Sequence, residues 1–373
     1  MNAFKDICFF PDGEVPNQLL EFRKHPMTKI LLDFSFPNKT EKEIDTLLNT
    51  CKSTQDFQKM VLAPAVQRLL SESSKGLSWS GFEHLEKGTA YLYISNHRDI
   101  VLDTTLVNYA LLKEGRIMTA SAIGDNLVHN DFLLTFAKLN RNFLVKRNLP
   151  PREMLMHSKE LSSYIAHLIQ KEQRSVWIAQ REGRAKDGHD TTQKGVLKML
   201  SLAKARKQDL LEYIQALNIV PIAISYELDP TDQLKTKELL ALEEIGTYEK
   251  QEGEDFKSIM TGLLGNKGRI HIQIADPLNN TIHELMKLGL AEGKLLQELA
   301  SLIDQKIHQN YHLWPNNYIA SDLLTGKGAY SEYYTQSEKE LFEDRLDKIQ
   351  STFSNSRAKE IFLSMYANPV QNK

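Results

Sequence analysis

The sequence predicts an α/β protein in which a mostly parallel sheet is flanked by helices. Short apolar segments alternate with amphipathic segments of helical period from residue 77 to about residue 290, which is typical of parallel strands covered on both faces. The segments before and after this region have only the helical period. We therefore expect an N-terminal helical region at residues 1–75, an α/β domain at residues 76–290 and a C-terminal helical extension at residues 291–373.

The composition is that of a globular protein with a sizeable core. The 373 residues are 41% hydrophobic and 25% charged, and the formal net charge of -2 argues against a dedicated nucleic-acid binder. The two cysteines, Cys8 and Cys51, are not spaced as metal ligands, so we expect no metal site and a reducing compartment. The first residues carry charge where a signal peptide has its apolar core. The sequence has no run of about 18 apolar residues, so we expect no membrane-spanning helix.

The N-terminal region is predicted to be helical. Lys42–Cys51 and Asp56–Leu70 carry apolar residues three and four positions apart, and Thr40 is suited to cap the first of these helices. Ser71–Gly76, with the sequence SESSKG, is the best linker in this part of the chain, so we place the domain boundary there.

The α/β domain is predicted to alternate strands with helices. The expected strands are Ala90–Ser95, Ile117–Ala122, Asn142–Val145, Ser175–Ala179, Ile219–Tyr226 and Arg269–Ile274. The expected helices are Asp103–Lys113, Asp131–Leu139, Arg152–Glu172, Lys194–Lys207 and Asp209–Leu217. In the C-terminal extension, helices are expected at Glu292–Gln309 and Ser337–Met365, with an aromatic turn at Trp314–Tyr318 between them. Active sites in such folds lie beyond the carboxyl ends of the strands.

The segment Thr89–Asp103, TAYLYISNHRDIVLD, joins a predicted buried strand to a loop that carries His97. A histidine in this position is a candidate general base, because the unperturbed pKa of the imidazole lies near neutral pH. A carboxylate a few residues later, Asp99 or Asp103, would hold the ring in one tautomer. The alternative is a surface histidine beside ordinary charges, and the segments downstream favour the functional interpretation.

Two cations, Lys146 and Arg147, follow the predicted strand Asn142–Val145. They form either a solvated basic edge that discourages strand pairing or a phosphate clamp. Arginine offers a planar fork of donors to phosphate oxygens, and lysine offers a mobile point charge.

Another charged segment, Glu182-Gly183-Arg184, follows the predicted strand Ser175–Ala179. Gly183 lets the backbone approach a ligand closely. Arg184, with Arg181 and Lys186 nearby, would bind a phosphate, while Glu182 would hydrogen-bond a polyol hydroxyl or hold the arginines in place. The alternative interpretation is a charged turn.

Together these segments resemble the four sequence blocks of the glycerolipid acyltransferases, the glycerol-3-phosphate and lysophosphatidate acyltransferase superfamily. The matching residues are Asn96-His97-Arg98 with the later Asp103, Phe143 with Arg147, Glu182-Gly183-Arg184, and Val220-Pro221-Ile222. The resemblance covers roughly residues 77 to 280, and four blocks in the right order are a specific signal. Lys194-Gly195 before a Met-Leu-rich helix, and Tyr226-Glu227 after the fourth block, look most like the glycerol-3-phosphate branch.

The first block departs from the family pattern by one residue. Five residues, and not four, separate His97 from Asp103. Because one residue rotates a helical side chain by roughly 100°, either the loop bulges so that Asp103 still meets His97, or Asp99 takes its place. In the third block, Arg181 stands where the family usually has proline, and Arg184 follows Gly183 directly.

The resemblance implies a glycerol-3-phosphate acyltransferase-like fold and acyl transfer from a thioester to a glycerol hydroxyl. The donor would be acyl-ACP (an acyl carrier protein) or acyl-CoA, and the acceptor would be glycerol 3-phosphate or 1-acyl-glycerol 3-phosphate of phospholipid biosynthesis. His97 would act as the general base, and Asp103 would orient it. The acceptor would be held through its phosphate and free hydroxyl by Lys146, Arg147, Glu182, Gly183, Arg184 and Lys194. No cofactor beyond the thioester cosubstrate is implied.

The implied partners are the acyl thioester donor, the phosphorylated glycerol acceptor and a membrane surface on which the protein is peripheral, with no nucleic acid. We expect a cytoplasmic location, with the protein on the inner face of the membrane where it meets lipid. Three other interpretations stay open: an acyltransferase for another lysolipid, such as an amino-acid lipid, a thioester hydrolase, and a non-catalytic lipid or acyl-carrier binding module.

Overall fold

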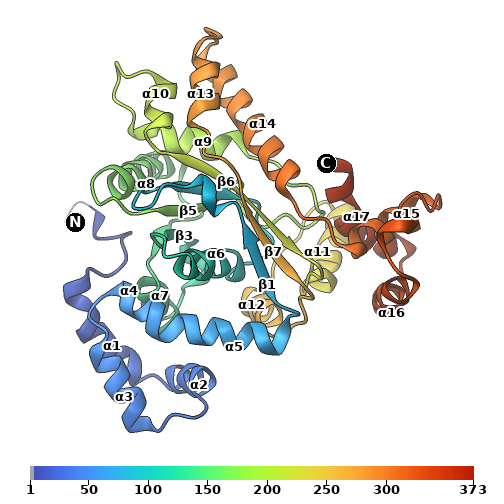
Figure 1. Cartoon of the computed structure of the whole chain (residues 1–373), viewed down its shortest axis with the longest axis horizontal. Helices are drawn as coiled ribbons and strands as arrows, with labels where there is room; N and C mark the ends of the chain where they lie inside the picture. The colour runs from blue at the N-terminus through green and yellow to red at the C-terminus, as the bar shows by residue number, and fades with distance from the viewer. Residues whose placement is uncertain (1–3) are drawn as a thin grey trace.

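A seven-stranded sheet lies at the centre of the computed structural model, which describes residues 4–373 (Figure 1). The strands follow the order β1-β7-β6-β2-β5-β3-β4 across the sheet. Their bounds are β1 Leu77–Ser80, β2 Leu92–Ser95, β3 Ala120–Gly124, β4 Asn142–Val145, β5 Val176–Ala179, β6 Ile219–Tyr226 and β7 Ile270–Ile274. Neighbouring strands are parallel except β6 and β7, which pair antiparallel. The predicted class, an α/β fold with a mostly parallel sheet flanked by helices, is confirmed.

Helices cover both faces of the sheet, since successive side chains of a strand point to opposite faces. On β2, Leu92 and Ile94 belong to one apolar core, while Tyr93 belongs to the other. The first core includes residues of α8 Pro151–Gln170, α9 Lys194–Leu200, α10 Leu210–Gln215, α13 Asn279–Met286 and α14 Glu292–Asn310. The second includes residues of α5 Ala63–Ser73 and α6 Leu102–Lys113, with α12 Glu254–Leu264 packed beside α5. The central strands are therefore buried on both faces, as parallel strands usually are.

The N-terminal helices form a smaller core of their own below the sheet in Figure 1. They are α1 Val15–Arg23, α2 Pro26–Ser35, α3 Glu41–Thr50, α4 Thr54–Phe57 and the π-helix η3 Gln58–Leu62, and they pack against α7 Asp131–Leu139. Thr40 caps α3, as predicted, because its side chain accepts from Glu43 N while the Glu43 carboxylate accepts from Thr40 N. The segment before α1 reaches the sheet: Ile7 O accepts a hydrogen bond of 2.9 Å from Leu144 N of β4.

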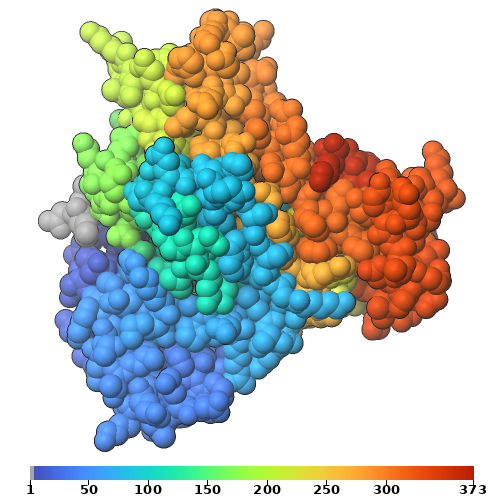
Figure 2. Space-filling view, viewed as in Figure 1, coloured from blue at the N-terminus to red at the C-terminus, as the bar shows by residue number. Residues whose placement is uncertain are grey.

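The C-terminal helices project from the opposite end of the molecule, where Figures 1 and 2 show them in orange and red. Here α15 Pro315–Thr325, α16 Gln336–Thr352 and α17 Ser356–Asn372 share an apolar core with α11 Asp232–Ile245. The prediction of one helix at Ser337–Met365 was wrong, because Asn355 caps a new helix by accepting from Arg357 N at 2.8 Å. The predicted aromatic turn ends at once in α15, which begins at Pro315.

Several elements differ from the sequence predictions. Strand β1 and helices α11, α12, α13 and α15 were not predicted, and the predicted linker Ser71–Gly76 is partly helical because α5 continues to Ser73. The predicted helix Lys194–Lys207 is divided into α9 and the 3-10 turn η6 Ser201–Ala203. The division into three domains stays a prediction.

Within residues 4–373 no helix is both long enough and apolar enough to cross a bilayer.

Candidate active site

The loops after β2, β4 and β5 meet at one edge of the sheet. Ser95 at the end of β2 pairs with Ala179 at the end of β5, and Gly124 of β3 pairs with Val145 at the end of β4. The residues predicted to be functional follow these strand ends closely along the chain. The parallel register therefore brings segments that are far apart in sequence to the same edge.

His97 and Asp103 are in direct contact. The distance from His97 Nδ1 to Asp103 Oδ2 is 2.8 Å, and the two side chains are 15% and 1% exposed. The imidazole also packs edge-on against the Trp177 ring, with 5.9 Å between ring centroids. The ring is thus held by a carboxylate on one side and an aromatic wall on another.

The Asp103 carboxylate is a well-supported acceptor. Its Oδ2 also accepts from Arg98 N at 2.7 Å and from Asp99 N at 3.0 Å, and its Oδ1 accepts from the Tyr226 hydroxyl at 2.9 Å. An oxygen that already accepts from two backbone N–H groups leaves Nδ1 of His97 as the donor in their contact. Nε2 is then the basic nitrogen, and no side chain or backbone group of residues 4–373 hydrogen-bonds to it.

Asp99 has a different role from Asp103. Its Oδ1 accepts from the backbone N–H groups of Val101 and Leu102, each at 2.9 Å, and so supports the start of α6. Burial raises the pKa of Asp99, and the nearby charge of Asp103 raises it further. Of the two carboxylates left open by the sequence, Asp103 is the one that contacts His97. The extra residue is absorbed in the loop, because α6 begins only at Leu102.

A cleft of about 630 Å³ opens at this edge of the sheet. Its size falls within the range of about 300–1,000 Å³ that is usual for small-molecule sites. Six of the eight residues predicted for the site line it: His97, Lys146, Arg147, Glu182, Gly183 and Arg184. Asp103 lies behind His97, and only Lys194 is elsewhere. The remaining lining includes apolar side chains from β3, the 3-10 turn η5 Asp125–Leu127, α8 and α9, among them Ile123, Leu127, Met154, Leu161 and Met199.

The cations after β4 face the loop after β5 across the cleft. Arg147 forms an ion pair with Glu182, and its backbone N–H donates to Asp125 at 3.1 Å. The Lys146 N–H donates to His157 Nε2 at 2.9 Å, which fixes the backbone of this pair. Of the two uses considered for Glu182, binding a hydroxyl or holding an arginine, the second is present in this arrangement.

Arg184 extends from the loop after β5 toward α12. Its Nη1 donates to the Ser258 hydroxyl at 2.9 Å, while the nearby Lys186, which also lines the cleft, pairs with Glu238 of α11. Gly183 has a φ of 70°, and this left-handed backbone turns the loop between Glu182 and Arg184. The cleft that His97 lines therefore carries positive charge from the loops that follow β4 and β5.

Lys194 does not line the cleft. It is the exposed first residue of α9, and its side chain extends toward Gly293 of α14. The helix directs Gly195, Val196 and Met199 to the cleft instead, because residues three and four apart share a face. The geometry does not support the expected contact of Lys194 with the acceptor phosphate.

Two residues of the site were not predicted from the sequence. Tyr226, at the end of β6, holds the second oxygen of Asp103, and Trp177 of β5 packs on His97. Both residues lie in apolar segments that predict strands. Such a segment does not show which of its aromatic rings faces a loop 50 or more residues away in sequence. The order of the strands is the information that would have found them.

Within residues 4–373, His, Cys, Asp and Glu side chains form no group of three or more that would hold a metal ion.

One comparison, with protein-family models, agrees with the sequence blocks. Residues 77–225 match the family model described as Acyltransferase. No curated protein matches the sequence. One similar solved structure is that of PlsC, the 1-acyl-sn-glycerophosphate (LPA) acyltransferase from Thermotoga maritima, at 14% identity and a TM-score of 0.36, over 83% of this chain and 98% of that chain. Residues 77–225 therefore carry an acyltransferase domain by the family model, in the part of the chain where the sequence blocks lie.

Proposed function

We propose that this acyltransferase moves a fatty acyl group from acyl-ACP or acyl-CoA to a hydroxyl of glycerol 3-phosphate or 1-acyl-glycerol 3-phosphate. The observation that carries the proposal is the shared cleft. A histidine backed by a carboxylate stands in it beside three cations, Lys146, Arg147 and Arg184, that suit a phosphate.

His97 would supply the base that a hydroxyl nucleophile needs at neutral pH. Nε2 accepts the hydroxyl proton while the oxygen attacks the thioester carbonyl carbon. The tetrahedral intermediate collapses with cleavage of the carbon–sulfur bond, and the imidazolium returns its proton to the leaving thiolate. Asp103 keeps the ring oriented and stabilises the imidazolium, which is the role of the third group in hydrolytic triads.

The cations would position the acceptor. A phosphate between Arg147 and Arg184 would replace part of the charge that Glu182 now supplies to Arg147. Most of the rate gain would then come from holding the hydroxyl and the thioester together in the cleft. The apolar lining from Ile123, Leu127, Met154 and Met199 is suited to the acyl chain.

The place where the protein works follows from the chemistry of the proposed product. A long-chain product is a lipid, so we propose that the protein works as a peripheral protein on a membrane surface. Sedimentation with vesicles of anionic phospholipid tests this part, and protein that stays in the supernatant at low salt would contradict it.

The decisive experiment is a transfer assay with purified protein. Radiolabelled palmitoyl-ACP and palmitoyl-CoA are each offered with glycerol 3-phosphate, 1-acyl-glycerol 3-phosphate, glycerol or an amino-acid lysolipid, and the products are separated. We expect labelled ester only with the phosphorylated acceptors. Equal transfer to glycerol or to the amino-acid lysolipid would reject the phosphate assignment, and free fatty acid as the sole product would indicate a hydrolase.

A further inference from the structure

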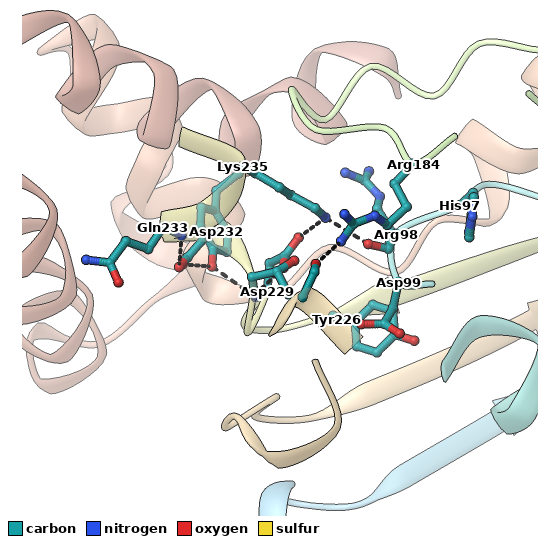
Figure 3. A network of polar contacts seen from close by, with 12 residues as sticks. His97, Arg98, Asp99, Arg184, Tyr226, Asp229, Asp232, Gln233 and Lys235 are labelled. Carbon is teal, nitrogen blue, oxygen red and sulfur yellow. Dashed lines mark hydrogen bonds and ion pairs between the residues drawn. The ribbon is translucent and has the colours of Figure 1, made fainter. Parts of the chain in front are cut away.

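Lys235 is a buried lysine close to the His97 loop but outside the cleft. It lies in the first turn of α11, and its side chain is 1% exposed. Its Nζ donates to the backbone carbonyl oxygen of Arg98 at 2.8 Å and forms an ion pair with Asp229 (Figure 3). Lys235 does not line the cleft that holds His97, so it is not placed to touch a substrate.

The Arg98 carbonyl belongs to the loop that presents the His97–Asp103 pair. The N–H of the same residue donates to Asp103 Oδ2 at 2.7 Å, the oxygen that His97 contacts. The Arg98 side chain pairs with the buried Asp190. Arg98 is therefore held at its nitrogen, its carbonyl and its guanidinium group, and Lys235 provides the carbonyl contact.

The support for Lys235 comes from the C-terminal helices. The Asp229 N–H donates to the Tyr366 hydroxyl of α17 at 3.0 Å, and that hydroxyl donates to Asp232 at 2.8 Å. Arg345 of α16 donates to Asp232 at 2.6 Å and to the Asp229 carbonyl at 2.9 Å. A continuous chain of hydrogen bonds and ion pairs thus runs from α16 and α17 to the Arg98–Asp99 peptide in the loop that carries His97.

A lysine is a costly residue to bury, because its charge must leave water. Burial lowers the pKa of Lys235, and the charge of Asp229 acts in the opposite direction. An apolar side chain would fill the same space without this cost, so the cost is offset by a contact that needs an N–H donor. The only backbone carbonyl that Lys235 Nζ contacts within residues 4–373 is that of Arg98.

We propose that Lys235 is a positioning residue, which fixes the Arg98 carbonyl and thereby holds the His97–Asp103 pair in register with the cleft. The C-terminal helices α16 and α17 serve the reaction through it, although none of their residues lines the cleft. The kinetic part of this inference rests on the proposed acyl transfer, while the geometric part does not.

The test compares Lys235→Met with Lys267→Met. Lys267 is also fully buried and also donates to backbone carbonyls, those of Leu263 and Gly265, but it makes no hydrogen bond to the His97 loop. Circular dichroism and thermal unfolding set the folded fraction of each variant. For K235M we expect kcat to fall by about 10- to 100-fold with both KM values within about threefold, as for a misplaced base. For K267M we expect kcat within about twofold of the parent.

A substrate-free readout separates positioning from general stability. The proton on His97 Nδ1, hydrogen-bonded to Asp103, should give a low-field ¹H resonance that is assigned by its loss in His97→Gln. We expect this resonance to shift or broaden in K235M and to stay in K267M. If K235M does not fold, Tyr366→Phe, which removes one hydroxyl from the chain of hydrogen bonds, should move the resonance and kcat in the same direction by less.

An unchanged resonance together with kcat within about twofold in folded K235M would overturn the proposal, and so would the same result in Y366F if K235M does not fold. Loss of kcat in K235M and K267M alike, at equal folded fraction, would also overturn it. If the parent protein shows no acyl transfer but K235M still alters the resonance, the proposed function fails while the positioning role stands.

Discussion

Tyr226 donates its hydroxyl to Oδ1 of Asp103 at 2.9 Å, while the other oxygen of that carboxylate contacts His97. Burial raises the pKa of Tyr226 well above its ordinary value, and the charge of Asp103 adds to this effect, so the phenol remains a donor. Both residues are almost inaccessible to solvent. The carboxylate that orients the base is thus clamped between the first helical turn after β2 and the end of β6.

Replacing Tyr226 by phenylalanine removes one donor from this carboxylate. We expect Tyr226→Phe to lower kcat by about 10-fold with little change in KM, because the orientation of His97 becomes less restricted. Leaving a buried acceptor short of a partner should also cost about 1–3 kcal/mol of unfolding free energy. Steady-state kinetics and urea unfolding measure the two effects. Tyr109→Phe is the control, since Tyr109 lies on the same helix as Asp103 and packs against Trp79; an equal loss there would remove the special role of Tyr226.

Replacing His97 removes the proposed base. We expect His97→Ala to lower the turnover number by at least about 100-fold, the lower range of general-base contributions. The fold should remain, because His97 is one partner of a loop that Asp103, Asp190 and Lys235 also hold. Turnover is measured with saturating thioester and acceptor, and circular dichroism reports the fold. The exposed His189 provides the control variant. Retention of more than a few per cent of turnover in H97A would assign the base to another group.

Replacing Arg184 should weaken binding of the phosphorylated acceptor. In Arg184→Ala the cleft loses a guanidinium whose present partner is the neutral Ser258 hydroxyl. We expect KM for the acceptor to rise by about 10-fold or more, since charge-assisted hydrogen bonds contribute about 1.5–3 kcal/mol. KM for the thioester should change much less. Arg206→Ala, at an exposed position, is the matched control. A parallel rise of both KM values in R184A would show that Arg184 does not select the phosphate.

The buried Lys267 predicts a dependence of stability on alkaline pH. Burial lowers the pKa of Lys267 from 10.5 to about 8. Between these two pH values Lys267 holds its proton in the unfolded chain and has released it in the folded chain. The free energy of unfolding therefore increases as the pH rises through this window. Below pH 8 both states are protonated, and the cost of burying the charge is present in full. We expect the difference in Tm between the parent and Lys267→Met to change in favour of the parent from pH 7.5 to 9.5. Parallel curves for the two proteins would contradict this assignment.

The sequence predicted the strands better than it predicted the contacts between side chains. Runs such as Ile219–Tyr226 are apolar enough to be recognised as buried strands, and the structure has a strand at the same positions. Once the strands are parallel, the loops that follow them must meet, which explains why His97, Arg147 and Arg184 share a cleft. β1 escaped prediction because LSWS is short and half polar, and it becomes a strand only through its pairing with β7.

The sequence did not predict features that depend on where a side chain points in the folded protein, because local spacing does not encode that direction. Lys194 follows a charged segment in sequence, but α9 turns its side chain toward α14. Asp99 lies in the loop before α6 and Asp103 lies in the first turn of α6, and only the start of the helix at Leu102 decides which of them meets the imidazole. Lys235 is one lysine among many in the sequence, and its burial arises from the packing of α11 between the His97 loop and the C-terminal helices.

The hydrogen bond from Leu144 to Ile7 has a consequence for solubility. β4 is the last strand of the sheet, and an outermost strand with free N–H and C=O groups is a template on which other chains pair. The segment that contains Ile7 contacts this strand at Leu144, and the Ile7 side chain enters the apolar core. A variant that lacks the residues up to and including Ile7 would expose β4 as an edge strand. We expect this variant to aggregate even though every residue of the cleft is in place.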